Sequence, residues 1–328
     1  MAGAQGSAMA LAVSRAGALG SLPCAMLTHE ALQAELQTMH DSGLPYNVNF
    51  FCHVPPSPDA SRTAAWHQTL EPYFREHGLS MASIPTGQGR VPFSLEAAEL
   101  LSQFKPPVVS FHFGLPSPEL LARVKAWGAL VLSSATTVHE ALWLQDHGAD
   151  AIIAQGLEAG GHRGNFLSPD LTEQMGTFAL LPQVVAAVQV PVIAAGGVVT
   201  PAAVRAAMAL GAMGVQAGTA YLCADEALTS ARHRAALQSE AARHTAVTNL
   251  FTGRPARGIV NRLMRELGPM SDVPPEFPLA TQAIGVLRAA AEKAECTDFT
   301  PLWSGQNASG CRNASAAEIT QSLAQGFA

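Results

Sequence analysis

The sequence predicts an α/β protein built as a parallel (β/α)8 barrel, the TIM-barrel architecture, with a small and mainly helical lid. Over the first two thirds of the chain, short apolar runs alternate with amphipathic stretches rich in Ala and Leu, a pattern typical of parallel sheets. No G-x-G-x-x-G turn follows the first apolar run and no G-x-x-x-x-G-K-S/T occurs, so the phosphate loops of open sheets are missing. With 328 residues, 48% of them hydrophobic, the chain can bury one large core.

The predicted strands are short β-branched or apolar runs, and a helical stretch follows each of them. Several helical stretches stop just before a glycine, the usual residue after a helix C-terminus. Strands are expected at 18–22, 46–51, 108–113, 130–133, 151–155, 192–195 and 213–217. Helices are expected at about 7–15 and at 29–40, 61–77, 118–127, 138–147, 181–188 and 201–210.

The βα alternation stops after residue 224. A charged helical stretch at 225–244 precedes a basic turn with Arg254 and Arg257, and a proline-rich segment covers 269–278. Further helices are expected up to about residue 267 and over 282–293 and 314–324. We therefore expect a barrel domain over 1–224 that carries the binding site, a lid or substrate domain over 225–280, and C-terminal helices over 281–328 that return to the barrel.

The predicted barrel lacks its first strand. Eight strands are needed, but the helical pattern at 7–15 begins almost at Met1 and leaves no room for a strand before it. We expect the missing strand to expose the edges of its two neighbours. A truncated start, from a misassigned initiation codon, is the hypothesis at this point.

Charge and composition exclude several kinds of partner. The formal net charge is −6 without a basic run, so neither nucleic acid nor an anionic membrane surface is expected. The longest apolar stretch, 178–199, is broken by Pro182 and Pro191, so no transmembrane helix is predicted. Five scattered cysteines without a C-x-x-C pair favour reduced thiols in the cytoplasm, and no metal-ligand spacing occurs.

Three glycine-containing loops follow predicted strands, where the sites of barrels lie. The first places His162 directly after two adjacent glycines, which allow close approach of the backbone to a ligand. The other two follow the last two strands, where such barrels bind phosphate with backbone N–H groups and a helix N-terminus. These loops cover 155–164, 194–198 and 216–219.

The amino-acid sequences of these loops are more specific than their positions. They read Ala-Gln-Gly-Leu-Glu-Ala-Gly-Gly-His-Arg-Gly at 154–164, Ala-Ala-Gly-Gly-Val at 194–198 and Gly-Ala-Met-Gly-Val-Gln-Ala-Gly-Thr at 211–219. With further matches at 46–50, 109–114, 251–258 and 302–306, nearly the whole chain resembles the FMN-dependent nitronate monooxygenases, formerly called 2-nitropropane dioxygenases. The resemblance implies oxidation of alkyl nitronates by FMN and O2 to a carbonyl compound and nitrite. Whether neutral nitroalkanes are also substrates stays open.

The resemblance also implies a role for each matched residue. His162 is the expected active-site acid or base, and two weaker candidates, His112 and Ser304, are expected to contact substrate. The flavin-ring contacts are expected from Asn49, Gln155, Gly160 and Gly161, and the phosphate contacts from Gly196, Gly197, Gln216, Ala217, Gly218 and Thr219. In this family the chain normally begins with a strand ending in Ala-Pro-Met-Ala-Gly, whereas this one starts at Met1-Ala2-Gly3.

Several alternatives remain open at the level of sequence. A protonated His162 would stabilise an anionic nitronate, whereas a neutral one would remove the α-proton of a nitroalkane. Glu158 suits a structural carboxylate better than a catalytic one, Asn49 might only cap a turn, and His112 might be a satisfied core residue. An FMN-dependent enoyl-acyl-carrier-protein reductase, a flavin-free phosphosugar-binding barrel and an inactive flavin-binding barrel are the rival functions. The oligomeric state also stays open, with a homodimer as one alternative.

Overall fold

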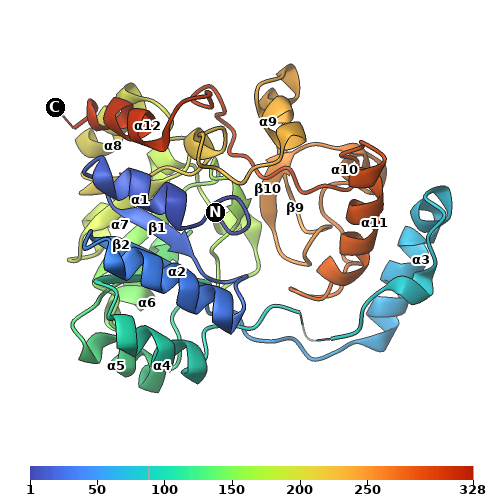
Figure 1. The fold of residues 1–328 in the computed structure, drawn as a ribbon, viewed down its shortest axis with the longest axis horizontal. Coiled ribbons are helices and arrows are strands. Elements are labelled where there is room, and N and C mark those ends of the chain that lie inside the picture. The colour runs from blue at the N-terminus through green and yellow to red at the C-terminus, as the bar shows by residue number, and fades with distance from the viewer. Residues whose placement is uncertain (88, 328) are drawn as a thin grey trace.

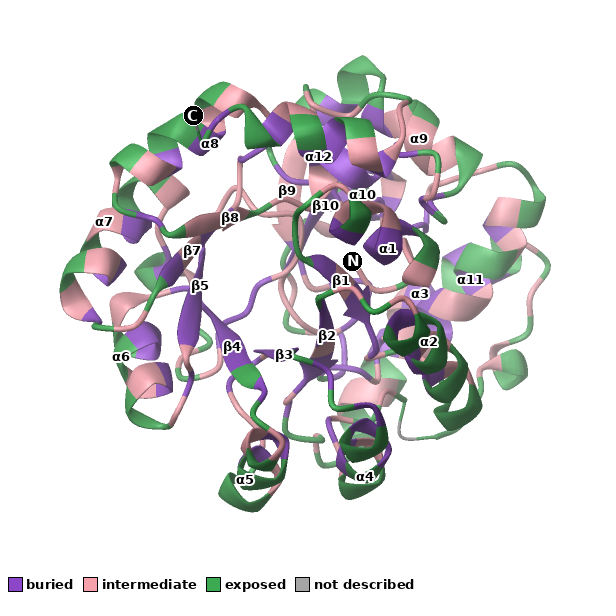
Figure 2. Cartoon of the chain, turned by 60° about the vertical axis from the view of Figure 1, so that its left-hand side comes forward, coloured by how far each residue is buried: buried purple, intermediate pink, exposed green. Residues whose placement is uncertain are grey.

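A curled sheet of seven parallel strands forms the centre of the molecule, in a computed structural model that describes residues 1–87 and 89–327. Helices surround this sheet, and their outer faces are exposed while the strands are mostly buried (Figures 1 and 2). The strand order is β1-β2-β3-β4-β5-β7-β8. The strands are β1 (Gly20–Pro23), β2 (Tyr46–Phe51), β3 (Val108–His112), β4 (Leu130–Ala135), β5 (Ala151–Gln155), β7 (Val192–Ala195) and β8 (Gly214–Gln216).

The helices of the barrel follow the strands in the expected alternation. Side chains of Ser, Thr or Asp accept the first free N–H groups in many of them, as Thr137 and Thr200 do for the helices after β4 and β7. The barrel helices are α1 (Ser7–Arg15), α2 (His29–Asp41), α4 (Leu95–Phe104), α5 (Pro118–Ala126), α6 (Val138–Asp146), α7 (Thr177–Ala187), α8 (Pro201–Ala209) and, near the C-terminus, α12 (Ala316–Ala324).

The sequence located most of these elements well. The ranges of β2, β5, β7 and α1 agree with the structure to the residue. The apolar runs of β5 and β7 are typical of strands that are buried on both faces. α7 begins at Thr177, four residues before the expected start, with Pro182 inside the helix. α4 was not expected, and it lies in the long connection between β2 and β3.

The sheet is open between β1 and β8. Within the described residues, β1 pairs only with β2 and β8 pairs only with β7. The expected strand over 18–22 is therefore an edge strand of the sheet, and β1 and β8 are each unpaired on one side. α1 packs against β1 and α12 beside this opening (Figure 1).

The lid has its own core and its own small sheet. α3 (Ala60–Glu76) packs against α11 (Thr281–Lys293), and both lie on the side opposite α8 and α12 (Figure 1). This core also contains residues of α10 (Arg262–Leu267) and Phe299. An antiparallel sheet of order β6-β10-β9 joins lid and barrel, formed by β6 (Gly161–His162), β9 (Thr245–Thr248) and β10 (Ala256–Ile259).

This small sheet was not predicted, and the charged stretch at 225–244 is less helical than expected. Only α9 (Ala231–Leu237) is an α-helix there, followed by a short 3-10 helix at Glu240–Arg243. The small sheet escaped prediction because its strands are two to four residues long, which is too short to show an alternating pattern of apolar residues. No helix of the described residues is long and apolar enough to cross a membrane.

Candidate active site

His162 lies at the mouth of the barrel inside a box of aromatic rings. It is the last residue of β6, a few residues beyond the end of β5. Its ring centroid lies 5.3 Å from that of Phe277, 5.6 Å from Trp303, 6.0 Å from Phe113 and 6.2 Å from Phe51. Barrel strands supply two of these rings and the lid and tail supply the other two, so the box forms only where the two parts meet.

Phe113 has a backbone conformation that non-glycine residues rarely adopt. Its φ is +71°, directly after β3, and such a conformation costs about 1–3 kcal/mol. The side chain is buried, and the guanidinium carbon of Arg254 lies 4.0 Å from the ring centroid. The contact between this ring and the cation of Arg254 offsets part of the cost of the backbone conformation.

One hydrogen bond determines the tautomer of His162. Its Nε2 lies 2.9 Å from Oγ1 of Thr252, in the loop between β9 and β10. The single hydroxyl proton of Thr252 is directed at the carbonyl oxygen of Arg254, 3.2 Å away. Thr252 Oγ1 therefore accepts from Nε2–H of His162. Nδ1, which makes no hydrogen bond to any described residue, keeps its lone pair free for a proton.

The surroundings of His162 favour the neutral ring. Burial lowers its pKa well below the usual range, and the positive charge of Arg90 lowers the pKa further. A cation over the adjacent ring explains this, because the guanidinium carbon of Arg90 lies 5.7 Å from the centroid of Phe277. The lowered pKa means that the imidazole of His162 is neutral at neutral pH.

His112 and Gln155 hold the backbone of His162 in place. The carbonyl oxygen of His162 accepts from Nε2 of Gln155 at 3.0 Å and from Nε2 of His112 at 3.2 Å. Nδ1 of His112 lies 3.0 Å from Oγ of Ser134, and Oε1 of Gln155 accepts from N–H of Gly164. Both ring nitrogens of His112 and both ends of the Gln155 amide therefore have hydrogen-bond partners. His112 is a satisfied neutral histidine next to the site, and burial lowers its pKa to about 3.

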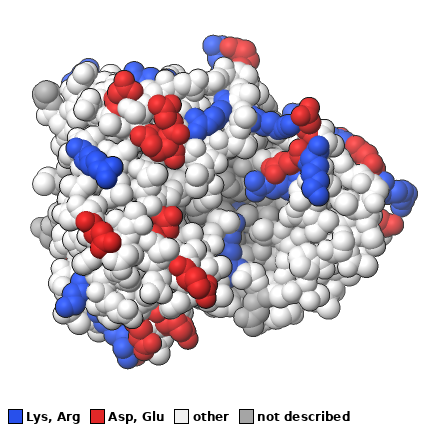
Figure 3. All heavy atoms as spheres, in the orientation of Figure 1, with Lys and Arg blue, Asp and Glu red and all other residues white. Residues whose placement is uncertain are grey.

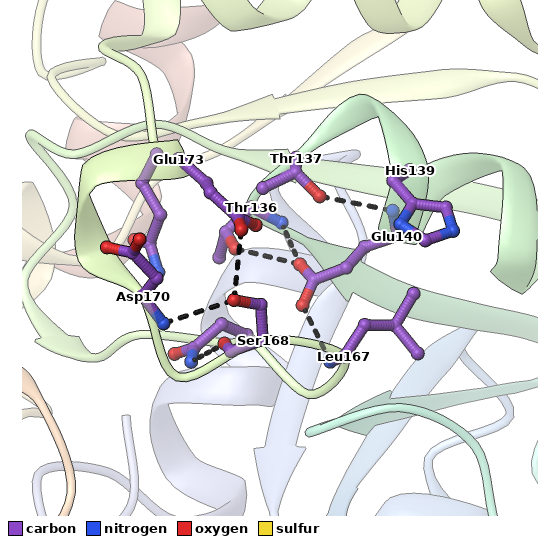
Figure 4. A pocket seen from close by; sticks show the side chains of 10 residues that line it. Thr136, Thr137, His139, Glu140, Leu167, Ser168, Asp170 and Glu173 are labelled. Atoms are coloured by element: carbon purple, nitrogen blue, oxygen red, sulfur yellow. Dashed lines mark hydrogen bonds between the residues drawn. The ribbon is translucent and has the colours of Figure 1, made fainter.

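Glu140 anchors the loop that follows His162. This buried carboxylate accepts hydrogen bonds from N–H and Oγ1 of Thr136 and from N–H of Phe166 and Leu167. Figure 4 shows it reaching from α6 towards the loop through Leu167. Four donors on one carboxylate hold the loop against the end of β4.

Arg163 and Glu158 anchor the other side of the loop. Arg163 is fully buried and donates to the carbonyl oxygens of Gln155 and Gly156 and to Oε1 of Gln174. The carboxylate of Glu158 accepts from N–H and Oγ1 of Thr177, at the start of α7. Glu158 therefore has the structural role that its sequence context favoured.

A cradle of free N–H groups lies at the ends of β7 and β8. Gly196 and Gly197 have φ of +113° and +72°, conformations that glycine alone adopts without strain. The amides of Gly197, Gly218 and Thr219 donate to no atom of the described residues. Amide donors that converge at a helix start fit a phosphate. These residues therefore fit the phosphate of FMN.

The remaining candidates lie near the site in different ways. Asn49 donates from Nδ2 to Oγ of Ser110 at 2.8 Å, so its amide is fixed at the end of β2. Gly160 touches the tail, since a Cβ there would lie 2.5 Å from N of Gly305. Ser304 is fully buried and its Oγ donates to the carbonyl oxygen of Gly305. The structure thus brings Ser304 to the glycine loop but leaves its hydroxyl occupied.

Sequence reasoning missed three functional residues. Thr252 accepts the hydrogen bond that selects the tautomer of His162. In the sequence, its segment was recognised only as part of a matched motif. Phe277 and Arg90 complete the box and its charge, but they come from a proline-rich segment and a long connection that have no periodicity. The only signal for Arg90 was an arginine isolated among small and apolar residues at 84–93.

Known proteins resemble this chain along its full length. A family model described as nitronate monooxygenase matches residues 1–326. The nitronate monooxygenase of Paraburkholderia phytofirmans is 40% identical over 330 residues, which cover 98% of this chain and 89% of the relative. That of Pseudomonas aeruginosa is 39% identical over 333 residues, with 99% and 93% coverage.

Solved structures share the fold. A nitroalkane oxidase from Streptomyces ansochromogenes has a TM-score of 0.90 at 35% identity and covers 100% of this chain and 93% of its own. FabK from Thermotoga maritima has a TM-score of 0.73 at 25% identity, with 100% and 90% coverage.

A curled parallel barrel with a phosphate cradle at its last strands and a histidine at its mouth is the arrangement of an FMN-dependent oxidoreductase. The motifs at 154–164, 194–198 and 211–219 narrow the class further. The chain belongs to the nitronate monooxygenase family. It is an FMN-dependent enzyme that oxidises nitronates, with a small-molecule substrate and O2 as the reactants.

Proposed function

We propose that His162 is a general base, so that neutral nitroalkanes are substrates in addition to their nitronates. The observation that carries this is the 2.9 Å contact between Nε2 and Thr252, which leaves the lone pair of Nδ1 free. A lowered pKa supports the same role, because the neutral ring accepts protons. In the reaction, the α C–H bond breaks and its proton moves to Nδ1. Its electron pair forms the C=N bond of the nitronate, while the N=O π pair moves onto a nitro oxygen.

Two guanidinium groups favour the anion that this step forms. Arg90 lies over Phe277 and Arg254 over Phe113, which are two of the rings of the box. Positive charge in a partly dry site stabilises developing negative charge on the nitro oxygens. Bound FMN would supply the redox chemistry by which O2 oxidises the nitronate to a carbonyl compound and nitrite.

We propose that the phosphate of FMN binds at Gly196, Gly197 and Gln216 to Thr219, and that its ring lies beside Asn49, Gly160 and Gly161. The free amides at Gly197, Gly218 and Thr219 support the first part. Gln155 would act through the backbone of His162, because both ends of its amide are engaged there. Ser304 would shape the tail rather than touch the substrate.

The decisive experiment compares nitroethane with ethyl nitronate in the wild type and in His162→Asn. We expect bound FMN in both proteins and a loss of nitroethane turnover of about 10²–10⁴-fold in the variant. Ethyl nitronate, which is already deprotonated, should lose far less. An equal loss on both substrates would contradict the base. Colourless protein that FMN cannot reconstitute would contradict the flavin site, and fast NADH oxidation would favour the reductase alternative.

We also propose the domain organisation, the location and the oligomeric state. The chain divides into domains at 1–224, 225–280 and 281–328, although α3, which lies in the first range, packs against α11 in the third. A cytoplasmic location is supported by five free cysteines. A homodimer is the proposed oligomeric state, and sedimentation equilibrium tests it directly.

A further inference from the structure

A large apolar cleft lies between the barrel and the lid, next to the aromatic box. Its volume is about 1000 Å³, at the upper end of the range for small-molecule sites. Its walls come from the end of β1 and the start of α2, the end of β2, the connection at 79–97, and one face of α11. Figure 3 shows this side of the molecule, where the hollow between the two parts has mostly uncharged walls.

The inner end of the cleft adjoins the site. Phe51 lines the cleft, and its ring centroid lies 6.2 Å from that of His162. Pro278, another lining residue, directly follows Phe277, whose ring is 5.3 Å from His162. The cleft and the box therefore share a wall, and a molecule with its reacting end at His162 can extend into the cleft.

Charge at this end matches an anion. Arg90 lines the cleft, lies over Phe277 and has no ion pair or hydrogen-bond acceptor among the described residues. A partly buried guanidinium without a partner is costly, so an incoming anion gains from pairing with it. The other charged lining residues are Lys293, at the end of α11, and Glu96, at the start of α4.

We propose that this cleft binds the alkyl chain of the substrate, and that the enzyme prefers nitronates with long unbranched chains whose anionic head pairs with Arg90. This inference rests on the proposed function, since it places the reacting carbon at His162. The lining supports an alkyl chain over a polar group, because Leu32, Phe50 and Phe93 contribute apolar walls that no polar chain would satisfy.

Chain length is the first test. We would measure O2 uptake by the FMN-loaded enzyme with propyl, pentyl, heptyl and nonyl nitronates. Burial of one methylene contributes about 0.8 kcal/mol, so kcat/KM should rise by up to about fourfold per methylene until the cleft is full. Most of the increase should appear as a lower KM. A kcat/KM that is independent of length overturns the proposal.

Gly285 offers a way to block the cleft without loss of folding. It lies within α11, lines the cleft, and a Cβ there meets nothing within 4 Å. Gly285→Leu should therefore improve helix propensity while filling the cleft. We expect nonyl nitronate to fall to the kcat/KM of propyl nitronate in this variant. Arg288→Leu, on the exposed side of the same helix, is the matched control and should keep the wild-type length series.

Binding of unreactive anions separates this inference from the base. Butanoate, hexanoate and decanoate carry the same charge as nitronates but are not oxidised, so calorimetric titration of the holoenzyme measures the cleft without turnover. Their Kd should fall with length in the wild type and not in Gly285→Leu, and Arg90→Gln should raise Kd about tenfold or more at every length. A length-independent Kd overturns the cleft even if His162 is a base. A dimer that Gly285→Leu dissociates would mean that a second copy covers the cleft, which also overturns the proposal.

Discussion

Oγ1 of Thr252 lies 2.9 Å from Nε2 of His162 and joins the lid to the mouth of the barrel. Because the Thr252 proton is directed at Arg254 O, the contact selects one tautomer of the imidazole. Thr252→Val should reduce kcat/KM for nitroethane by about 10–10²-fold, since Nε2–H loses its acceptor. Steady-state O2 uptake measures this. Thr252→Ser, which keeps the hydroxyl, should recover most of the rate; a serine variant as poor as the valine variant would mean that the methyl group matters instead.

The pH profile reports the protonation state of His162. Burial and Arg90 lower its pKa below the usual 6.5, and the proposed base is the neutral ring. We expect kcat/KM for nitroethane to stay constant from pH 8 down through 6.5 and to fall only at lower pH. Oxidation of a preformed nitronate should lack this acidic limb, provided that the pH stays above the pKa of the nitronate. A rate on nitroethane that rises as the pH falls would contradict a basic role.

Stability should depend on pH through His112. Its pKa is lowered to about 3 in the folded protein, so between pH 6.5 and 3 the unfolded chain binds a proton that the folded one does not. The free energy of unfolding therefore decreases as the pH falls through this window. Between pH 7 and 5 this one group should cost about 2 kcal/mol. Urea unfolding of wild type and His112→Gln at both pH values isolates the effect, which should be absent from the variant.

A negative charge in the cradle should expel the phosphate. Gly218→Asp places a carboxylate beside the free amides of Gly218 and Thr219, and repulsion from a phosphate dianion should raise the Kd of FMN at least tenfold, about 1.4 kcal/mol. Flavin fluorescence during titration of apoprotein measures Kd. Gly218→Asn has the same shape without the charge and should bind FMN much more tightly than the aspartate variant. Equal affinities would place the phosphate elsewhere.

Glu140 should matter for stability rather than for chemistry. Glu140→Gln replaces one acceptor oxygen with an NH2 group, so donors among Thr136, Phe166 and Leu167 lose their partner. One or two unsatisfied buried donors cost about 1–3 kcal/mol each. Chemical unfolding should show a loss in this range. Glu173→Gln, at an exposed position in the same region, is the control and should change the free energy of unfolding by less than about 0.5 kcal/mol.

The sequence predicted the elements of the barrel more completely than those of the lid, for a physical reason. Parallel strands buried on both faces leave apolar runs, so β5 and β7 could be located to the residue. The strands of β6, β9 and β10 are too short to leave a period, and their pairing joins segments far apart in the chain. Motifs placed His162 at the site, but the partner that sets its tautomer could be identified only after folding brought Thr252 to it.

The position of α3 has a consequence for how the chain is made. Trp66, Leu70 and Phe74 are buried in a core completed by α10 and α11, and Arg262 pairs with Glu76 across 186 positions. During synthesis, α3 leaves the ribosome early. Its apolar face therefore stays exposed to water or bound to a chaperone until the last quarter of the chain emerges. Translation that pauses or ends before α11 should therefore yield an aggregation-prone, protease-sensitive product even when every barrel strand is present.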